Sequence, residues 1–333
     1  MSELCLITGA TGALGPSVVG AFLTRGYRVR TFSRHPAPSG LFDPSVEVLQ
    51  GDILDGDAAR RAVGEARIVV HLAALLHIFD PPDSLRDTYH RVNVEGTRTI
   101  VRASEEAGVR RIVFCSTISV YGDSQSAVLT EGLPPSPDTW YAKTKFEAEK
   151  IVLDARDHQG HPIGTVLRLS AVYGGRIKGN YFRLVQSLDR RRFVRLGAAR
   201  NRRALVYDKD VGRAVVLAGE HPAAAGEIFN VSDGAAPTLA QIIDNICSAL
   251  GRPSPRFSVP LKPVAWVIGA ANSIATRLGL ALPVTPAILA KYEHDLVVDS
   301  GKLRDRLGFV PSYDQTLGWR DAVAEMRANG WLR

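Results

Sequence analysis

The sequence predicts an α/β fold in which a doubly wound parallel sheet is joined to a smaller C-terminal lobe. Short apolar runs alternate with helical patterns along the first half of the chain, as in parallel sheets covered by helices on both faces. A glycine-rich turn separates the first apolar run from the first helix. The chain of 333 residues, 45% of them hydrophobic, suffices for one ordinary α/β domain plus an appendage and excludes general disorder.

The expected elements follow one another in a regular order. Strands are predicted at 4–7, 28–32, 46–50, 68–73, 111–115 and 164–169, and helices at 16–25, 57–64, 93–107 and 140–158. The first domain then spans residues 1–173, and residues 174–333 mainly form a lobe over the carboxyl ends of the strands. Segments at about 204–207 and 227–231 are expected to add strands to the first sheet, because no linker separates the two parts.

Composition excludes several classes of protein. Cys5, Cys115 and Cys247 lie far apart in the chain, which indicates reduced thiols in a cytoplasmic protein rather than disulfides or a metal site. No cleavable signal is visible. The apolar stretch 264–284 is interrupted by polar residues and predicts a buried or interface helix, with contact to a membrane surface or lipid-linked substrate as the weaker alternative. A net charge of +7 mildly favours anionic ligands.

The first turn has the spacing of a dinucleotide phosphate loop, with glycines at 9, 12 and 15. Gly9 permits a tight turn, Gly12 lets backbone N–H groups approach a pyrophosphate, and Gly15 lets the helix pack closely. The amino end of the helix favours the anion. The residues predicted to hold the phosphates are Gly9, Thr11, Gly12, Ala13, Leu14 and Gly15.

The following strands predict the rest of the cofactor site. Where an acidic residue would bind the adenosine ribose, this chain has Ser33 and Arg34, which suit a 2′-phosphate and favour NADP over NAD. Asp52 is expected to accept from the adenine amino group, and Ile53 to pack on its ring. Small residues are expected where a strand end passes under the cofactor, at Leu72, Ala73 and Ala74.

A tyrosine and a lysine stand one helical turn apart, at Tyr141 and Lys145, with Lys143 out of phase. The lysine and an oxidised nicotinamide would both stabilise phenolate, so the pKa of Tyr141 is expected to fall toward the working pH. Tyr141 then acts as general acid or base, and Lys145 also holds the nicotinamide ribose. Ser116 and Thr117 follow a strand, where a hydroxyl can bind the same substrate oxygen.

These motifs resemble the extended short-chain dehydrogenases/reductases of the NAD-dependent epimerase/dehydratase family, whose fold is Rossmann-type. The similarity extends over nearly the whole chain and includes the segments 93–97, 114–122, 167–174 and 307–311. It implies that Thr117 is the catalytic hydroxyl, and that Asn93, Ser116 and Leu169 belong to the cofactor site. Ser170 departs from the family, whose members often have Pro there.

The second lobe resembles the nucleotide-sugar branch of that family, in particular UDP-sugar 4-epimerases and 4-keto-reductases of surface-polysaccharide synthesis. The resemblance implies that Asn180 and Arg203 hold the substrate diphosphate, which a planar guanidinium suits. Seven arginines lie between 190 and 203, of which only Arg203, and secondarily Arg195, is assigned to ligand. Leu289 stands where the epimerases usually have arginine, and Lys291 or His294 is a candidate substitute.

The leading hypothesis is an NAD(P)-dependent oxidoreductase or epimerase acting at C4 of a nucleotide sugar, most often a UDP-sugar, in a cytoplasmic homodimer. Epimerisation and keto-reduction share the same catalytic residues, and the sequence leaves the choice open. One alternative is an NADPH-dependent reductase or dehydrogenase of a hydrophobic ketone or hydroxysteroid-like substrate. A second is a non-catalytic dinucleotide-binding protein. Nucleic-acid binding, which only the arginine run suggests, is not expected.

Overall fold

The computed structural model describes residues 2–76, 83–124, 126, 128–255, 257–260 and 294–332. The chain divides into two compact units. Unit 1 comprises residues 1–172, 206–234 and 298–312, and unit 2 comprises residues 173–205, 235–297 and 313–333. Residues 298–312, which the sequence analysis assigned to the smaller lobe, belong to unit 1, because Leu303 and Leu307 are buried in its hydrophobic core.

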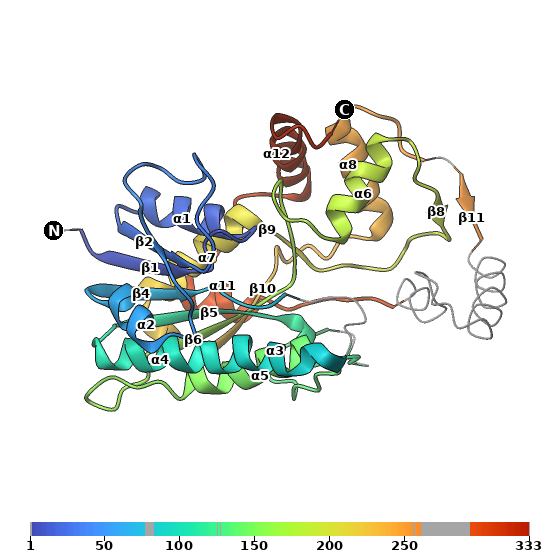
Figure 1. Ribbon diagram of the computed structural model, residues 1–333. Helices are drawn as coiled ribbons and strands as arrows, with labels where there is room; N and C mark the ends of the chain where they lie inside the picture. Colours follow the sequence, from blue (N-terminus) through green and yellow to red (C-terminus); the bar gives the residue numbers. More distant parts are fainter. Residues whose placement is uncertain are drawn as a thin grey trace. The chain divides into compact units, whose positions relative to one another are not determined.

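Unit 1 is built on a seven-stranded parallel sheet with the strand order β10-β6-β5-β4-β1-β2-β3 (Figure 1). The strands are β1 (Leu4–Thr8), β2 (Arg28–Ser33), β3 (Glu47–Gln50), β4 (Ala66–His71), β5 (Arg111–Thr117), β6 (Gly164–Leu169) and β10 (Ile228–Val231). This order confirms the predicted doubly wound fold. The winding direction reverses between β1 and β4, and ligands of such sheets bind outside the carboxyl ends of the strands at the reversal.

Helices cover both faces of this sheet (Figure 1). One face carries α1 (Gly15–Thr24), α7 (Asp208–Glu220) and α11 (Gly301–Leu307), and the other carries α2 (Gly56–Val63), α4 (Gly96–Glu106) and α5 (Trp140–Leu153). The shorter helical elements of unit 1 are η1 (Asp83–Leu85), α3 (Arg86–His90), η2 (Arg91–Glu95), η3 (Ile118–Tyr121) and η4 (Pro222–Ala224). Of these, η2 is a π-helix, a form that occurs often at functional sites.

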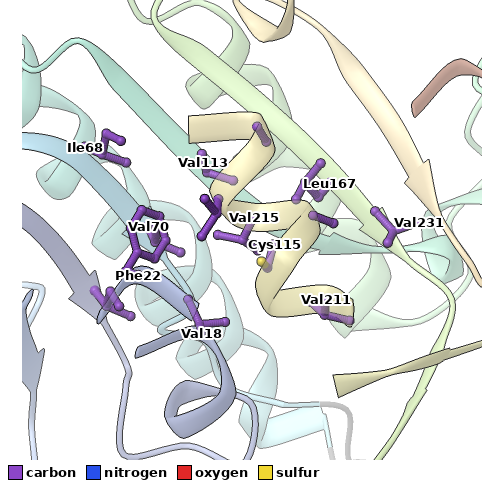
Figure 2. Close-up of a cluster of buried hydrophobic side chains, with 14 of the residues drawn as sticks. Val18, Phe22, Ile68, Val70, Val113, Cys115, Leu167, Val211, Val215 and Val231 are labelled. Atoms are coloured by element: carbon purple, nitrogen blue, oxygen red, sulfur yellow. The ribbon is translucent and has the colours of Figure 1, made fainter. Parts of the chain in front are cut away.

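The core consists of two apolar layers, one on each face of the sheet. Val113 and Cys115 of β5 point toward α7, where they belong to the same cluster as Val215 (Figure 2). Ile112 and Phe114, the alternate residues of the same strand, belong to the cluster on the opposite face. Because its strands are buried on both faces, the sheet explains the nearly continuous apolar runs in the sequence.

Two expectations about individual elements are wrong. The segment near 204–207 forms β9 (Leu205–Tyr207), which is not a strand of the seven-stranded sheet, because β10 already occupies the free edge of β6. The helix expected to reach residue 158 ends at Leu153. Beyond it, Asp157 closes a turn by accepting from the N–H groups of Gln159 and His161, at 2.8 and 2.9 Å, and a side-chain bond of this kind competes with the helix.

Unit 2 is mainly helical. It contains α6 (Asn180–Asp189), α8 (Leu239–Leu250) and α12 (Gln315–Ala328), together with a short parallel pair of β8 (Arg195–Leu196) and β11 (Ser258–Val259). The short strand β7 (Ala171–Tyr173) lies where the chain leaves unit 1. Trp319 of α12 is buried and stacks on Tyr173 with ring centroids 4.2 Å apart. Arg327 donates to the carbonyl of Leu250 at 2.9 Å, which ties α12 to the end of α8.

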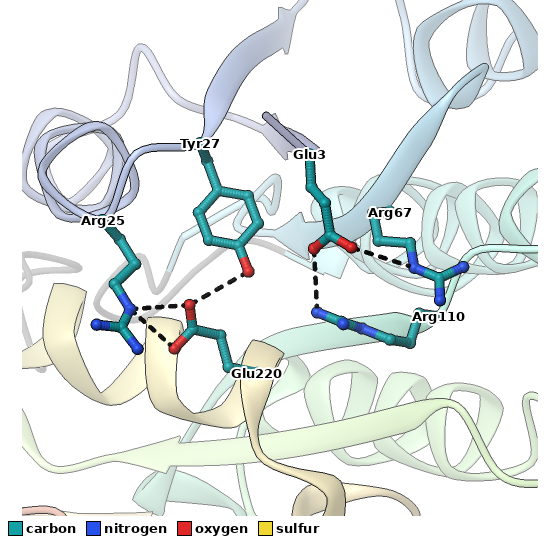
Figure 3. Close-up of polar contacts among 6 residues, drawn as sticks. All are labelled: Glu3, Arg25, Tyr27, Arg67, Arg110 and Glu220. Atoms are coloured by element: carbon teal, nitrogen blue, oxygen red, sulfur yellow. Dashed lines mark hydrogen bonds and ion pairs between the residues drawn. The ribbon is translucent and has the colours of Figure 1, made fainter. Parts of the chain in front are cut away.

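The amino edge of the sheet, where its strands begin, carries a polar cluster (Figure 3). Its members are Glu3, Arg25, Tyr27, Arg67, Arg110 and Glu220. Glu220 at the end of α7 accepts from Arg25 at 3.0 Å and from the Tyr27 hydroxyl at 3.2 Å. Glu3 pairs with Arg67 and Arg110 at 3.6 and 3.5 Å. These pairs join the segments that lead into β1, β2, β4 and β5.

Two features are absent from the described residues. None of the described helices is both long enough and apolar enough to span a bilayer. No group of three His, Cys, Asp or Glu side chains in the same residues is arranged to hold a metal ion. The stretch 264–284, for which the sequence predicted a helix, lies outside the described residues, as do Leu289 and Lys291.

Candidate active site

The glycine loop joins β1 to α1 at the carboxyl edge of the sheet, where the strands end. Gly9 has a φ of +68°, and a Cβ there would stand 2.6 Å from the backbone of Ala73. At Gly15, a Cβ would lie 1.8 Å from the carbonyl oxygen of Ala10. Only glycine fits at each of these two positions. Gly9 therefore lies directly against the segment after β4, and Gly15 lets the start of α1 lie close to the backbone of Ala10.

The amino end of α1 is open to a ligand. No described side chain caps it, and its N-cap residue is Leu14. The N–H of Gly15 donates to the Gly12 carbonyl at 3.1 Å and Pro16 has no N–H, so the attraction of this helix end for an anion comes from the helix dipole and the other N–H groups of the turn. Thr11, Gly12 and Ala13 are partly or fully exposed in the same loop. The geometry of the loop suits the pyrophosphate of a dinucleotide, and the binding of one by these residues stays a prediction.

The ends of β2 and β3 present the residues expected at the adenosine half. Arg34 is exposed directly after β2, and its Nε donates to His35 at 3.3 Å. The hydroxyl of Ser33 is buried and has no hydrogen-bond partner among the described residues. Asp52 accepts from the N–H of Leu54 at 3.0 Å, which uses one carboxylate oxygen in a turn.

Ile53 lies in a different environment from the one expected. Its side chain is 8% exposed and belongs to the core cluster shared by α2 and α4. A Cβ on Gly96 would approach its Cδ1 to 2.4 Å, so Ile53 packs against the first residue of α4. The side chain therefore mainly joins the loop to this helix.

The segment after β4 is held by two buried polar side chains. Asn93, in the π-helix η2, accepts from the N–H of Leu75 at 2.7 Å and donates to Thr144 of α5 at 3.1 Å. His71 lies 2.7 Å from the Thr8 hydroxyl and 3.1 Å from that of Thr97. These contacts fix Leu72, Ala73 and Ala74 between β1 and α5.

The predicted catalytic residues come from α5 and the end of β5. Lys145 is buried, and its Nζ donates to the carbonyl of Cys115 at 2.7 Å. Tyr141 lies four residues earlier on the same helix and is half-buried. Thr117, the last residue of β5, caps η3 by accepting from the N–H of Ser119 at 3.1 Å, and its hydroxyl also contacts that of Ser119 at 3.1 Å. The Thr117 hydroxyl remains partly exposed.

Burial controls the protonation of these groups. It lowers the pKa of Lys145 to about 8, while Cys115 and Glu149 act in the opposite direction. Burial, and then the charge of Lys145, lowers the pKa of His71 to about 3, so His71 is neutral. Burial also raises the pKa of Tyr141 to about 12, with Tyr89 and Cys115 adding to the rise.

The lowered pKa expected for Tyr141 included the charge of a bound oxidised nicotinamide, so it stays a prediction for the cofactor-bound protein. Desolvation of the phenol is the largest cause of the raised pKa, because removing an anion from water is costly. The protein groups alone therefore keep Tyr141 neutral. A lowered pKa at this position requires the further positive charge of an oxidised nicotinamide.

Sequence reasoning missed an ion pair beside these residues. Glu149 of α5 binds Arg168 of β6 through both carboxylate oxygens, with Nη2 to Oε2 at 2.7 Å. Ser116, which was expected to contact the cofactor, donates its hydroxyl to Oε1 of Glu149 at 2.5 Å. The available signal was the spacing, because Glu149 follows Lys145 by one helical turn and Arg168 interrupts an apolar strand.

The remaining predicted residues are placed as follows. Leu169 is 8% exposed and packs in the core cluster of α1 and α7. The next hydroxyl, that of Ser170, is buried without a hydrogen-bond partner among the described residues.

Asn180 and Arg203 belong to unit 2. Asn180 is exposed at the start of α6, whose amino end no described side chain caps. Arg203 is half-buried, and its Nη1 donates to the carbonyl of His294 at 2.8 Å. One arm of this guanidinium is thus held by the backbone.

Comparison with known proteins adds to this picture. The sequence profile of the NAD dependent epimerase/dehydratase family matches residues 5–232. A 3 beta-hydroxysteroid dehydrogenase/Delta 5-->4-isomerase of Mycobacterium tuberculosis is 28% identical, covering 92% of this chain and 86% of the relative. A UDP-glucose 4-epimerase of Vibrio cholerae is 29% identical, covering 78% of this chain and 80% of the relative.

A solved structure has the same fold along the whole chain. It is that of UDP-glucuronic acid 4-epimerase from Bacillus cereus, in complex with UDP-glucuronic acid and NAD, with a TM-score of 0.77 and 21% identity. The match covers 98% of this chain and 100% of that protein. At this identity the likeness supports the fold and leaves the substrate open.

Proposed function

The chain belongs to the NAD-dependent epimerase/dehydratase family, and we propose that it is an NAD(P)-dependent oxidoreductase or epimerase acting at C4 of a nucleotide sugar. The contact that carries the redox part is the one between Lys145 Nζ and the Cys115 carbonyl. It holds the ammonium against β5, one helical turn from Tyr141 on α5 and two residues before Thr117 on the strand.

In this mechanism, a bound nicotinamide supplies the site of hydride exchange. Tyr141 transfers the proton of the sugar hydroxyl, Thr117 orients its oxygen, and Lys145 holds the nicotinamide ribose. The loop at Gly9 and the open end of α1 fit the cofactor's pyrophosphate, as described above. Epimerisation oxidises the hydroxyl to a ketone and then reduces it, and a keto-reductase carries out only that second step with the same residues, so both remain within this proposal.

The substrate class rests on unit 2. The uncapped amino end of α6 at Asn180 and the guanidinium of Arg203 offer the donors that a diphosphate requires. The UDP-glucose 4-epimerase among the similar proteins supports the same class. We infer that Asn180 and Arg203 bind the diphosphate of a UDP-sugar.

Calorimetric titration of UDP, dTDP and GDP into cofactor-loaded protein tests this assignment. We expect UDP to bind, and Arg203→Ala to weaken it by about tenfold to a hundredfold without changing dinucleotide affinity. Arg200→Ala removes one exposed charge from the same arginine run and serves as the matched control. Three flat titrations of the wild-type protein would eliminate the nucleotide-sugar assignment.

For the cofactor, we propose NADP. Arg34 and the Ser33 hydroxyl stand where a 2′-phosphate would lie, and the segment 31–34 contains no carboxylate. The solved relative contains NAD. Denaturing the purified protein and identifying the released dinucleotide tests the preference directly. Tightly held NAD would favour epimerisation, and exchangeable NADPH would favour reduction.

We further expect a homodimer, which analytical ultracentrifugation can test.

One observation favours a second candidate. The similarity to a 3 beta-hydroxysteroid dehydrogenase/isomerase covers 92% of this chain, so a hydrophobic ketone or hydroxysteroid is the alternative substrate. It uses the same Tyr141, Lys145 and Thr117. Under this alternative no nucleoside diphosphate binds in the calorimetric titration, and Arg203→Ala has little effect on substrate affinity. A hydroxysteroid is instead oxidised in the presence of the dinucleotide.

A further inference from the structure

We propose that Glu149 is a positioning residue, which fixes the end of β5 through Ser116 and provides the counter-charge for Lys145. This inference rests on the proposed function, because it assigns a role around the same catalytic groups. No residue of the ion pair between Glu149 and Arg168 was part of the sequence-based site.

Two hydrogen bonds join α5 to β5. Glu149 accepts from the Ser116 hydroxyl at 2.5 Å, and Lys145 donates to the Cys115 carbonyl at 2.7 Å. The two contacts join consecutive residues of the strand to residues one turn apart on the helix. Together they fix the strand against the helix in rotation and in translation. Thr117 is the next residue of the strand, so its position is set by this double anchor.

Glu149 is itself held in place by Arg168. Arg168 contacts both of its oxygens, at 3.1 Å from Nε to Oε1 and 2.7 Å from Nη2 to Oε2. The guanidinium also lies over the ring of Tyr121, 4.9 Å from its centroid. Tyr121 in turn donates to Asn230 of β10 at 2.8 Å. A bidentate pair allows one orientation of the carboxylate, so Glu149 cannot rotate away from Ser116.

The ion pair between Arg168 and Glu149 is deeply buried, and its burial costs desolvation free energy. The side chains of Arg168 and Glu149 are 2% and 1% exposed. Removing two charges from water at such depth often costs more than their attraction returns, and apolar residues of similar volume would serve stability as well. Moreover, Nη1 of Arg168 is buried without a hydrogen-bond partner among the described residues. Stability alone therefore does not explain the pair, whereas a requirement for fixed geometry beside the catalytic groups does.

Glu149 also contributes a negative charge to the surroundings of Lys145. The titratable groups around Lys145 are Tyr141 and Glu149 on α5, Cys115 on β5 and His71 on β4. Glu149 itself faces Arg168 from β6 and the Ser116 hydroxyl from β5. Of the groups around Lys145, His71 is neutral and Cys115 is a buried thiol, so Glu149 is the carboxylate that supports the ammonium. Burial already lowers the pKa of Lys145 to about 8, and loss of the Glu149 charge lowers it further.

The experiment compares Glu149→Gln, Glu149→Asp and Ser116→Ala with wild type. Carbon-13-labelled lysine NMR of the cofactor-free protein follows the titration of Lys145, with Lys145→Met identifying its signal. We expect Glu149→Gln to lower the Lys145 pKa by about one unit. Glu149→Asp keeps the charge and loses reach, so it leaves the titration near that of wild type. Ser116→Ala removes only the hydroxyl contact and also leaves the titration in place.

The three variants separate charge from geometry in the rate. We expect kcat to fall about tenfold to a hundredfold in all of them, with little change in dinucleotide affinity. The matched control is Asp210→Asn, on the opposite face of the sheet. There, a carboxylate that is 1% exposed pairs with Arg213 at 2.8 Å. This variant should lose stability and leave both the Lys145 titration and kcat unchanged.

Two results would overturn the proposal: an unchanged Lys145 titration in folded Glu149→Gln, or kcat within about threefold of the control in Ser116→Ala. If Glu149→Gln does not fold, Ser116→Ala and Glu149→Asp still decide the positioning role, because both keep a negative charge beside Arg168. The titration needs no substrate. Absence of wild-type turnover with any nucleotide sugar would therefore count against the proposed function and not against this inference.

Discussion

The two edges of the central sheet use charge in different ways. At the amino edge, the Arg25 side chain is 63% exposed and pairs with Glu220, and Glu3 lies about half exposed between Arg67 and Arg110. At the carboxyl edge, the pair of Arg168 and Glu149 is almost completely buried. Exposed pairs contribute little to stability and cost little to form, whereas a buried pair carries a large desolvation cost.

Side-chain geometry is fixed more precisely at the carboxyl edge than at the amino edge. The amino-edge pairs join loops that have no other predicted task, and water can replace each contact. The carboxyl-edge groups lie beside Lys145 and Thr117, where a small displacement would misalign the reacting groups. Substitutions at the two edges should therefore differ in kind: loss of chemistry at one, and small loss of stability at the other.

The largest effect should come from Tyr141→Phe. The phenol carries the proton, and removing one oxygen leaves the shape of the site intact, so kcat should fall by about a hundredfold to ten-thousandfold. Steady-state kinetics measure the rate, and fluorescence titration of the dinucleotide supplies the control, which should be nearly unchanged. A variant with turnover within a few-fold of wild type would show that the carboxyl edge is not organised around Tyr141.

Arg34→Ala tests the same edge at the cofactor's other end. If its guanidinium pairs with a 2′-phosphate, NADP affinity should fall about tenfold to a hundredfold. NAD lacks that phosphate, so its affinity should hardly change. Titration of both dinucleotides into the same variant measures the ratio. Equal losses for the two cofactors would locate the preference at other residues.

His71 predicts a pH-dependent stability at the carboxyl edge. Its pKa is about 3 in the folded protein and about 6.5 when unfolded, so below pH 6.5 the unfolded chain binds the proton that the folded chain refuses. Stability from this group is complete above pH 6.5 and is lost as pH falls toward 3. Between pH 7 and pH 5 the loss should be about 2 kcal/mol.

Urea denaturation of wild type and His71→Asn at these two pH values isolates this contribution, because all other groups titrate in both proteins. The variant should be less stable at pH 7 and should lose less on acidification. Parallel pH profiles for the two proteins would show that folding does not lower the pKa of His71.

The smallest effect should come from Glu220→Gln at the amino edge. The substitution removes an exposed ion pair and keeps a hydrogen-bonding group near Tyr27, so the melting temperature should fall by only about one or two degrees. Thermal scans measure this change, and kcat should equal that of wild type. A drop comparable with that of Asp210→Asn would erase the contrast between the two edges.

The parts of the site that the sequence predicted are those with short-range spacing. Gly9, Gly15, Tyr141 and Lys145 lie within single turns of chain, where the required geometry itself dictates the residue type. The doubly wound fold could be predicted for a similar reason, since each strand and helix has its own periodicity.

The rest depended on contacts between distant segments. Glu149 meets Arg168 across 19 residues, and His71 meets Thr8 across 63. No local pattern distinguishes such partners from solvated side chains. The same limitation explains the wrong placement of residues 204–207, because competition for the edge of β6 is decided by β10. The rise that burial causes in the pKa of Tyr141 was also out of reach, because sequence shows neighbouring charges but not burial.

The division of unit 1 into three stretches of chain has a consequence for synthesis and engineering. The chain passes into unit 2 three times, and the two excursions from which it returns begin three residues after a strand ends, at Val172 after β6 and at Gly234 after β10. During translation, β6 stays without its outer neighbour until residues 228–231 have emerged, and the nascent sheet exposes a bare edge for that period. A fragment ending near residue 173 should therefore aggregate, so the dinucleotide-binding unit cannot be isolated by simple truncation. The two excursions could instead be exchanged as cassettes, since the order and register of all seven strands are set outside them.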